Sequence, residues 1–462
     1  MSELLLLFVI FVEGFVTISA EILTMRQLIP MVGNSIVVTS LIIGVFLLFL
    51  AYGYQRGGKV ASDDIRALKA NFAKSAIWLG VGLSYVVIEL FFHYFKRYVS
   101  HNSLWVLTAY LLIVTAPLVY LLGQTVPMVM NLIRSEHKAG TIGGKILHFS
   151  TIGSFFGSVL TSLFLMNYLG VGWTVFINYA LLTGLVLLLF TNLKADFFQA
   201  SFLIFFIFIV YHLNVSMENK LFVKTNAQAN YKVSHDDEDI YLEANGSHSS
   251  YLSKNKEGFH YIEAIKKILF RDLELKDKSI LVLGAGGFTL SAEGSYGNNF
   301  LYVDFDKDIK AVVEKDFLKT IQGSFQSSDA RAFLNSTDRV FDVIVSDVYG
   351  SKSAVPAHLL TVEYFNQMKK KLVPEGIAVI NIIARPTLSD PYSYRVDNTI
   401  RTAFNRCMSV PMSYTEGLGN IIYVCHNDKD DKSHAPLEIY SDNLNQATLD
   451  FFKSQLDKTQ GK

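Results

Sequence analysis

A succession of long apolar stretches in the first half of the chain constrains the fold more than any other feature of the sequence. Each stretch approaches the ~20 residues that a helix needs to cross a bilayer. Their number argues against the buried helices of a large soluble protein. They lie near residues 4–29, 35–54, 76–95, 104–130, 147–167, 172–191 and 197–213. We therefore expect a multi-pass α-helical membrane domain of about seven spans over residues 1–216.

Ionisable residues inside the first apolar stretch are exceptions to this pattern. Glu13 and Glu21 lie near one face of the expected helix, and Arg26 follows them. Charges at that depth are costly and usually face the interior of a bundle or a cavity. They could form a polar site for a cationic ligand, or an internal ion pair that only holds helices together. The sequence leaves both interpretations open.

The sequence beyond about residue 215 has the composition of a soluble domain. The formal net charge of the chain is zero, so there is no electrostatic case for a nucleic-acid partner. The two cysteines, Cys407 and Cys425, are too far apart for a CxxC motif, and we expect neither a disulfide framework nor a zinc site. The histidines are scattered without ligand spacing, so no bound metal is expected.

A Gly-rich turn follows an apolar run at residues 280–283 and reads Gly284-Ala285-Gly286-Gly287. A second apolar run, 300–303, ends on Asp304, 20 residues after Gly284. At this spacing a carboxylate meets the ribose hydroxyls of a bound nucleoside. Further strands are expected at 341–346 and 376–383, with helices near 307–320 and 361–372 between them. This alternation predicts a parallel sheet covered on both faces over 257–462, preceded by a β-hairpin element over 217–256.

Acidic residues stand where the expected strands end. Asp304 ends the second strand, Asp347 ends the strand at 341–346, and Asp329 precedes the helix-like segment that starts at Ala330. Ligands bind parallel sheets at the carboxyl ends of the strands. For Asp329 a helix N-cap is an equally good interpretation. A carboxylate at the end of an apolar strand, such as Asp347, is costly without a partner or a task.

These pieces together resemble a known family. LVLGAGG, VDFD, SSDARAFL, FDVIVSDVYG, HLLTVEYF and LVPEGIAVIN resemble the catalytic domain of spermidine synthases, which are aminopropyltransferases with a methyltransferase-like Rossmann fold. EANGSHSS and FHYIE resemble the hairpin and the helix start that precede it. EGFVTISAEILTMRQL, LGQTVPMVM and FSTIGSFFGSVL are similar to the membrane spans that are fused to such domains in bacteria.

The resemblance implies roles for particular residues. The family binds an adenosyl sulfonium, S-adenosylmethionine or its decarboxylated form, between the Gly-rich turn and the strand ends. Asp304 would bind the ribose hydroxyls, Asp329 would accept from the adenine amino group, and Asp347 would act beside the reacting centre. The implied cofactor-binding set is Gly284, Ala285, Gly286, Asp304, Phe305, Asp329 and Ala330; the implied catalytic pair is Asp347 and Tyr349; the implied amine pocket is His248, Tyr261 and Glu263.

Two positions depart from the family pattern. Gly287 stands where the family has an Asp that holds the amine of the cofactor, and Gly350 stands where it has a second acid after the catalytic Asp. Tyr349 is a candidate to replace part of their role. The leading hypothesis is a membrane-bound aminopropyltransferase-like enzyme that releases 5'-methylthioadenosine. The departures favour an alternative, cleavage of S-adenosylmethionine without an amine acceptor, and the intramembrane acids favour a transporter or sensor with an adenosyl-binding domain.

The resemblance also implies a location and partners. We expect an integral protein of a bacterial inner membrane, an adenosyl small molecule and a polyamine as ligands, and a homodimer as a candidate assembly. Basic loops carrying Arg56, Lys59, Arg134 and Lys138 are cytoplasmic by the positive-inside rule. Seven full crossings would then place the C-terminal domain outside. Because adenosyl compounds are intracellular, we nevertheless expect a cytoplasmic C-terminal domain.

Overall fold

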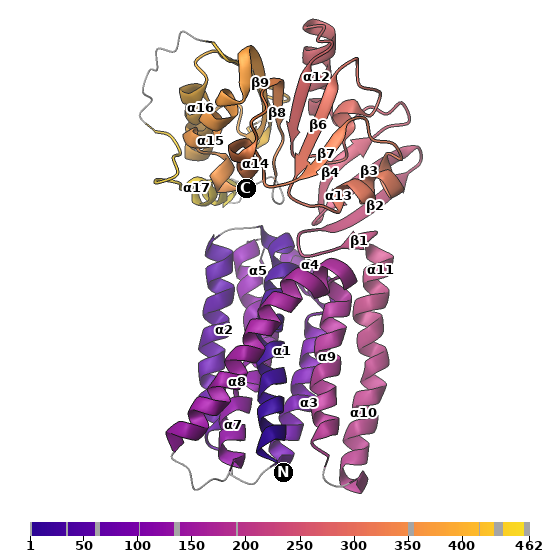
Figure 1. Ribbon diagram of the computed structural model, residues 1–462, viewed down its shortest axis with the longest axis vertical. Coiled ribbons are helices and arrows are strands. Elements are labelled where there is room, and N and C mark those ends of the chain that lie inside the picture. Colours follow the sequence, from indigo (N-terminus) through magenta and orange to yellow (C-terminus); the bar gives the residue numbers. More distant parts are fainter. Residues whose placement is uncertain are drawn as a thin grey trace. The chain divides into compact units, whose positions relative to one another are not determined.

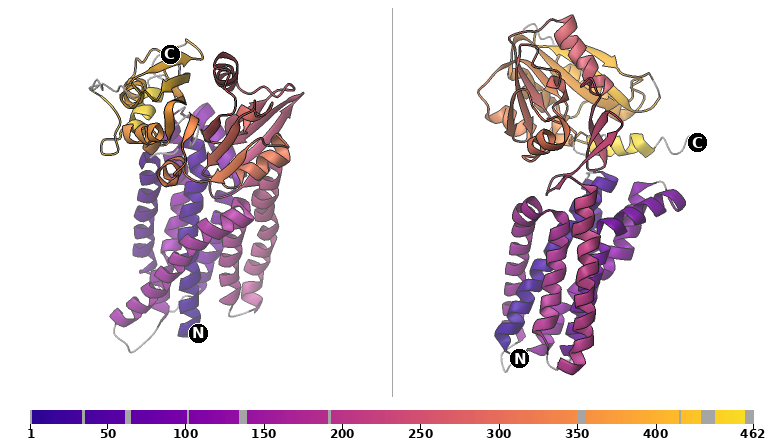
Figure 2. Two further views of the ribbon diagram at one scale, coloured as in Figure 1. Left: turned by 45° about the horizontal axis from the view of Figure 1, so that its top comes forward. Right: turned by 90° about the vertical axis from the view of Figure 1, so that its right-hand side faces the viewer.

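The computed structural model describes residues 2–33, 36–60, 65–100, 102–133, 139–190, 193–349, 355–414, 416–428 and 438–456. The chain divides into two compact units, Met1–Asn230 and Tyr231–Lys462. The first is helical, and the second is an α/β unit built on a seven-stranded sheet (Figures 1 and 2).

The helical unit consists of long apolar helices joined by short connections. Six described stretches are long and apolar enough to cross a membrane, and α3 with α4, bent by 64°, would form a seventh. The elements are α1 (Glu3–Val32), α2 (Ile36–Gly57), α3 (Ile65–Gly82), α4 (Tyr85–Tyr98), α5 (Ser103–Tyr110), η1 (Leu111–Thr115), α6 (Ala116–Gly123), α7 (Thr125–Leu132), α8 (Ala139–Leu160), η2 (Thr161–Leu169), α9 (Val171–Leu188), α10 (Leu193–Tyr211), η3 (His212–Ser216) and α11 (Met217–Leu221).

Helices α1 and α8 cross at unusually short range because glycines line their contact. A Cβ atom added at Gly153 would collide with the backbone of Phe11, and one added at Gly157 would collide with the backbone of Phe15. Small residues at such contacts let membrane helices pack backbone against backbone. This pairing places the polar residues of α1 inside the unit.

A small antiparallel sheet precedes the large sheet in the sequence. The small sheet has the order β1-β2-β3-β4, and the large sheet has the order β10-β11-β9-β8-β5-β6-β7. The strands are β1 (Lys224–Thr225), β2 (Asn230–Asp236), β3 (Asp239–Ala244), β4 (Ser247–Leu252), β5 (Ser279–Leu283), β6 (Asn299–Asp304), β7 (Ser324–Ser327), β8 (Phe341–Ser346), β9 (Leu372–Ala384), β10 (Cys407–Pro411) and β11 (Gly419–His426).

Helices cover both faces of the large sheet. Residues of α14, α15, α16 and α17 form one apolar core with the strands, and α12 and α13 lie on the other side (Figure 1). The helical elements are α12 (His260–Lys266), η4 (Lys267–Asp272), η5 (Thr289–Ser291), α13 (Ile309–Val312), η6 (Val313–Phe317), α14 (Ala330–Ser336), η7 (Ala357–Leu359), α15 (Val362–Lys370), α16 (Pro391–Ala403) and α17 (Ala447–Leu456). The expected Rossmann-like fold is confirmed.

Strands β5, β6, β7, β8 and β9 pair in parallel, whereas β10 and β11 pair antiparallel at one edge. The apolar runs of the sequence predict four of the parallel strands but not β7, whose four residues read SFQS and contain no apolar run. Four residues are too few to display a periodicity. The strands β10 and β11 were not predicted either.

The expectation that the two cysteines take part in no disulfide framework was wrong. Cys407 on β10 lies directly opposite Cys425 on β11, and the two form a disulfide across the strand pair. An antiparallel pair brings together residues that are 18 apart in the sequence. Motif spacing cannot show this, because it depends on the position of the turn between the strands.

Filling the α1–α8 contact should destabilise the helical unit. Gly153→Leu forces the two backbones apart, and overpacking of this kind costs about 1–3 kcal/mol. Gly143→Leu on the same helix is the matched control, because nothing lies within 4 Å of a Cβ atom at that position. Thermal unfolding of the detergent-solubilised chain should show a lower midpoint for the first variant alone. Equal midpoints would contradict this packing.

Candidate active site

The Gly-rich turn holds three strand ends of the large sheet together. Gly284 has a φ of 89°, and a Cβ atom there would collide with the carbonyl of Asp347. The Gly284 N–H donates to the carbonyl of Val303 over 2.8 Å, and the Asp347 N–H donates to the carbonyl of Leu283 over 2.8 Å. Only glycine combines this conformation with so close an approach. The carboxyl ends of β5, β6 and β8 therefore meet at one point of the sheet edge.

Asp304 faces this turn from the end of β6. Its Oδ2 accepts from the Ala285 N–H over 2.9 Å, and its Oδ1 accepts from the Asp306 N–H over 3.0 Å. Burial raises the pKa of Asp304 to about 6, against the lowering effect of these backbone hydrogen bonds. The next residue, Phe305, exposes half of its side chain. A partly buried carboxylate beside a glycine turn is well placed to accept from hydroxyl groups.

Asp329 precedes α14 and caps it. Its Oδ1 accepts from the Ala332 N–H over 2.9 Å, so the N-cap interpretation describes one of its oxygens. Its Oδ2 lies 3.2 Å from Nε2 of His358. Partial burial raises the pKa of Asp329, but the hydrogen bonds from Ala332 and His358 outweigh it and hold the pKa below its usual value. Ala330, the first residue of the helix, is buried.

Asp347 is the most constrained carboxylate of this edge. Its Oδ2 accepts from the hydroxyl of Tyr261 over 2.9 Å, and its Oδ1 accepts from Nδ2 of Asn381 over 2.8 Å. Burial raises its pKa, and the two hydrogen bonds oppose the rise. The Tyr349 hydroxyl donates to the backbone carbonyl of Asn381 over 3.1 Å. The structure therefore brings Asp347, Tyr349 and Tyr261 together around Asn381.

Asn381 was not among the residues expected from the sequence. It lies in β9, next to β8, and its side chain is 2% exposed. A single amide in the apolar run of β9 is the signal that could have identified it, because a buried polar side chain needs a partner. Its Nδ2 has that partner in Asp347, while its Oδ1 is buried without one among the described residues.

Glu263 and His248 make other contacts. Oε1 of Glu263 accepts from the Gly258 N–H over 2.6 Å and from Nζ of Lys266 over 2.8 Å, which ties it to the start of α12. The His248 ring packs 5.6 Å from the ring of Tyr241, and its Nδ1 lies 4.0 Å from Glu243. Its side chain is 61% exposed on β4. Neither side chain shares the hydrogen bonds of Asp347.

A row of aromatic rings connects the hairpin to the carboxylate. The ring centroids of Tyr241 and Tyr251 are 5.2 Å apart, those of Tyr251 and Phe259 are 5.6 Å apart, and those of Phe259 and Tyr261 are 6.2 Å apart. Tyr261 then donates to Asp347. We call Tyr241, Tyr251, Phe259 and Tyr261 the aromatic row. Aromatic faces of this kind attract cations.

Close packing around Gly287 explains why the acidic residue of the family pattern is absent at this position. The Gly287 N–H donates to Oγ of Ser250 over 2.7 Å, and a Cβ atom at this position would lie 2.5 Å from the Phe317 ring and 2.7 Å from Cβ of Ser250. An acidic side chain here would require both neighbours to move. Gly350, the second departure, lies outside the described residues.

The polar residues of α1 belong to the helical unit. Glu13 is 3% exposed and accepts from the Thr17 hydroxyl over 2.6 Å. Glu21 is partly exposed. Arg26 donates from Nε to the carbonyl of Asn226 and from Nη2 to Oδ1 of Asn230, over 2.8 and 2.7 Å. These bonds of Arg26 hold the chain beyond the last helix.

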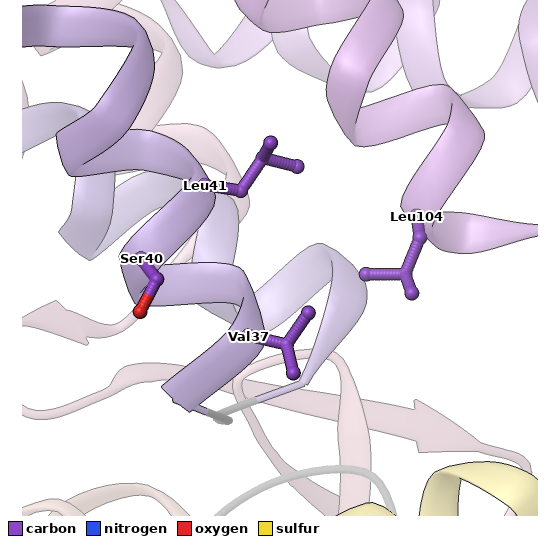
Figure 3. Close-up of a pocket in the computed structure, with 4 residues that line it drawn as sticks. All are labelled: Val37, Ser40, Leu41 and Leu104. Atoms are coloured by element: carbon purple, nitrogen blue, oxygen red, sulfur yellow. The ribbon is translucent and has the colours of Figure 1, made fainter.

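A hollow in the helical unit has a different character from the strand-end site. Val37, Ser40 and Leu41 of α2 line it together with Leu104 of α5 (Figure 3). These residues carry no ionisable group, so this hollow offers no acid or base. Among the residues that the structure describes, no three His, Cys, Asp or Glu side chains are placed to share a metal ion.

The comparisons with known proteins agree with this geometry. A family model described as the spermine/spermidine synthase domain matches residues 259–433. This stretch is therefore similar to the spermine/spermidine synthase family. The match includes Asp304, Asp329, Asp347 and Asn381. It begins at residue 259 and so also contains the last two members of the aromatic row, Phe259 and Tyr261.

Two relatives carry related names. A polyamine aminopropyltransferase of Synechococcus sp. is 30% identical over 138 residues, which are 28% of this chain and 44% of that protein. Polyamine aminopropyltransferase 2 of Pseudomonas aeruginosa is 22% identical over 168 residues, 34% of this chain and 48% of that protein. The chain thus spans less than half the length of these relatives.

Solved structures of spermidine synthases align with part of the chain at lower identity. A probable spermidine synthase from Corynebacterium glutamicum is 21% identical, with a TM-score of 0.38, over 45% of this chain and 80% of that chain. Spermidine synthase from Thermotoga maritima is 15% identical, with a TM-score of 0.35, over 50% of this chain and 84% of that chain.

The raised pKa of Asp304 predicts a pH dependence of stability. A carboxyl group whose pKa is higher in the folded chain stabilises the fold at low pH and loses this contribution as the pH rises through the folded value. For Asp304 the window runs from about pH 4 to about pH 6. Asp304→Asn should flatten the fall in thermal stability across this window. The measurement is the midpoint of thermal unfolding as a function of pH. Parallel curves for the variant and the unaltered chain would show that Asp304 does not have this raised pKa in the folded chain.

Proposed function

We propose that the chain is a membrane-bound aminopropyltransferase-like enzyme that binds decarboxylated or intact S-adenosylmethionine and releases 5'-methylthioadenosine. The observation that carries the proposal is the partly buried carboxylate of Asp347, held by Tyr261 and Asn381 beside the Gly284 turn. The spermine/spermidine synthase domain supports a transferase of this type. The helical unit would hold the enzyme in a bacterial inner membrane.

The adenosyl group would lie along the strand ends. Asp304 would accept from the ribose hydroxyls in place of water, with the backbone of Gly284, Ala285 and Gly286 close enough for the ligand to approach. Asp329 would accept from the adenine amino group. Its Oδ2 contacts the exposed ring of His358. Hydroxyl and amino donors favour ionised carboxylates, so binding would lower the raised pKa of Asp304.

The transfer itself needs a neutral amine. The sulfonium withdraws electrons from its neighbouring carbons. The lone pair of the amine nitrogen attacks the aminopropyl carbon that is bonded to sulfur. The carbon–sulfur bond breaks, and its electron pair stays on sulfur, which leaves as methylthioadenosine. The attacking nitrogen sheds one proton, and Asp347 would accept it directly or through water.

The surroundings of Asp347 suit this task. Burial raises its pKa toward that of a useful base, and the hydrogen bonds from Tyr261 and Asn381 fix its orientation. The aromatic row leads from the hairpin to Asp347 and offers ring faces to a cationic amine. The carboxylate would also stabilise the positive charge that passes from sulfur to nitrogen during the transfer.

One observation favours a second candidate function. There is no room at Gly287 for the acidic side chain that the resemblance leads us to expect. One carboxylate that would bind a cationic group of the substrate is therefore missing. Without an amine acceptor, Asp347 would instead take a proton from the substrate in an elimination, or the carboxylate of S-adenosylmethionine itself would attack the carbon bonded to sulfur. In either case the carbon–sulfur bond breaks, its electron pair stays on sulfur, and methylthioadenosine is released. The two functions differ in their response to a diamine.

Loss of the Asp304 carboxylate should weaken adenosyl binding. We expect Asp304→Ala to reduce the affinity for methylthioadenosine by roughly 1.5–3 kcal/mol, the scale of hydrogen bonds to a charged group. Glu314→Ala is the control, because its side chain is 42% exposed and pairs only across the surface with Lys310. Calorimetric titration distinguishes the variants, and an unchanged affinity in Asp304→Ala would refute this role.

Loss of the Asp347 carboxylate should abolish most of the chemistry. We expect Asp347→Asn to lower methylthioadenosine production by about 10²-fold or more, the scale for losing a positioned base, with a much smaller change in adenosyl affinity. Asp338→Asn, an exposed residue ahead of β8, is the control.

The same assay separates the two candidate functions. Production is measured with each adenosyl compound, with and without putrescine. Saturable stimulation by putrescine supports aminopropyl transfer, and production that ignores putrescine supports cleavage. Full activity of Asp347→Asn would remove Asp347 from either mechanism.

A further inference from the structure

The connectivity of the helical unit separates two ends that differ in charge. At one end, Nζ of Lys145 at the start of α8 lies 3.0 Å from Oε1 of Glu3 at the start of α1. Asn131 at the end of α7 donates to the carbonyl of Val60, just after α2, over 2.9 Å. The starts of α1 and α8 and the ends of α2 and α7 therefore share this end, which we call the basic end.

The last helix runs to the opposite end. Glu218 of α11 accepts from the hydroxyl of Tyr85, at the start of α4, over 3.2 Å, and also from the Gly172 N–H at the start of α9. Arg26, near the end of α1, holds Asn226 and Asn230. These contacts lie inside the first unit and are buried. They fix the point where the chain leaves the helical unit, which we call the exit end.

Two hydrogen bonds show that the ends of α3 and α4 lie at the exit end. Nζ of Lys96, near the end of α4, donates to the carbonyl of Met31 in the last turn of α1 over 3.2 Å. Asn214 of η3 donates to the carbonyl of Gly80, near the end of α3, over 2.8 Å. Thus α3 crosses from the basic end to the exit end, where α4 stays, and the long apolar stretches alternate in direction along the chain.

More basic residues lie near the basic end of the helical unit than near the exit end. Around the basic end the sequence carries Arg56, Lys59, Arg66, Arg134, Lys138, Lys145 and Lys194. Around the exit end it carries Arg26, Lys96, Arg97, Lys220 and Lys224. Short loops rich in Lys and Arg stay in the cytoplasm. The basic end is therefore the cytoplasmic one, and the chain passes from the helical unit to residue 231 on the other side.

The disulfide is an independent observation with the same implication. Cys407 and Cys425 are the two cysteines of the chain, and they are paired across β10 and β11. Structural disulfides form and persist outside the reducing cytoplasm. Forming this one removes two protons and two electrons from the thiols, and an oxidised thiol–disulfide oxidase of the extracytoplasmic compartment would accept them.

We infer that the basic end of the helical unit faces the cytoplasm and that residues 231–462, with the candidate active site, fold on the extracytoplasmic face. This inference rests on the proposal that the helical unit spans a membrane, and it is independent of the proposed reaction. It reverses the expectation of a cytoplasmic C-terminal domain, which came from where adenosyl compounds are made. The adenosyl substrate must then cross the membrane before it reaches Asp304.

Two single-cysteine variants of the full chain test this orientation. Both carry Cys407→Ser and Cys425→Ser; one adds Lys59→Cys at the basic end and the other adds Lys254→Cys in the second unit. Both positions are exposed, and the Lys254 side chain is 67% exposed. A membrane-impermeant maleimide is applied to intact bacterial cells. We expect it to label the Lys254→Cys variant at once and the Lys59→Cys variant only after permeabilisation.

Labelling of the Lys59→Cys variant before permeabilisation, with protection of the Lys254→Cys variant, would overturn the inference. The unaltered chain gives a second test that needs no substitution. Alkylation after rapid acid quenching should modify neither Cys407 nor Cys425 unless a reductant is added first. Free thiols in cells that can form disulfides would contradict an extracytoplasmic domain. Neither test reads enzymatic activity, so failure here is distinguishable from failure of the proposed function.

Discussion

The close approach of the Gly284 turn to the backbone of Asp347 is the contact on which the candidate site depends. Parallel strands bring their carboxyl ends to one edge, but side chains at that edge meet only if the intervening loops leave room. A side chain at residue 284 would displace the carbonyl of Asp347. Because the turn is glycine, the ends of β5, β6 and β8 meet at one point of the sheet edge, and Asp304 and Asp347 lie at two of these ends.

The carboxylates of this edge differ in character because their surroundings differ. Asp304 is held by backbone N–H groups, Asp329 by the start of a helix and a histidine, and Asp347 by a tyrosine and an amide. Burial raises the pKa of Asp304 and Asp347, whereas the pKa of Asp329 is lowered. An exposed, ionised acceptor and a buried base with a raised pKa are suited to recognition and to catalysis, respectively.

The sequence predicted what depends on local pattern and missed what depends on tertiary register. Apolar runs and the acids at their ends predicted β5, β6 and β8 and the position of Asp347 at the sheet edge. Asn381 was missed because its contact with Asp347 depends on the parallel register of β8 and β9, which places Ser346 opposite Ile380. The Cys407–Cys425 pair was missed for the same reason on β10 and β11.

The contacts of Glu263 could not be read from the motif that contains it. In the structure its carboxylate accepts from Gly258 and Lys266 at the start of α12, and its place in an amine pocket stays a prediction. Tyr261, two residues before it, donates to Asp347. Which partner each side chain reaches depends on how α12 packs, and no local pattern in the sequence specifies that packing.

The fate of the aminopropyl group tests the central claim most directly. The purified full-length chain is incubated with decarboxylated S-adenosylmethionine that carries an isotopic label in this group, together with putrescine, and the products are separated by mass spectrometry. The account predicts methylthioadenosine in equal amount to a labelled polyamine. Methylthioadenosine with the label in a fragment not joined to putrescine would indicate cleavage instead of transfer. An adenosyl substrate that remains intact under all conditions would contradict the assignment of Asp347 and its partners to an active site.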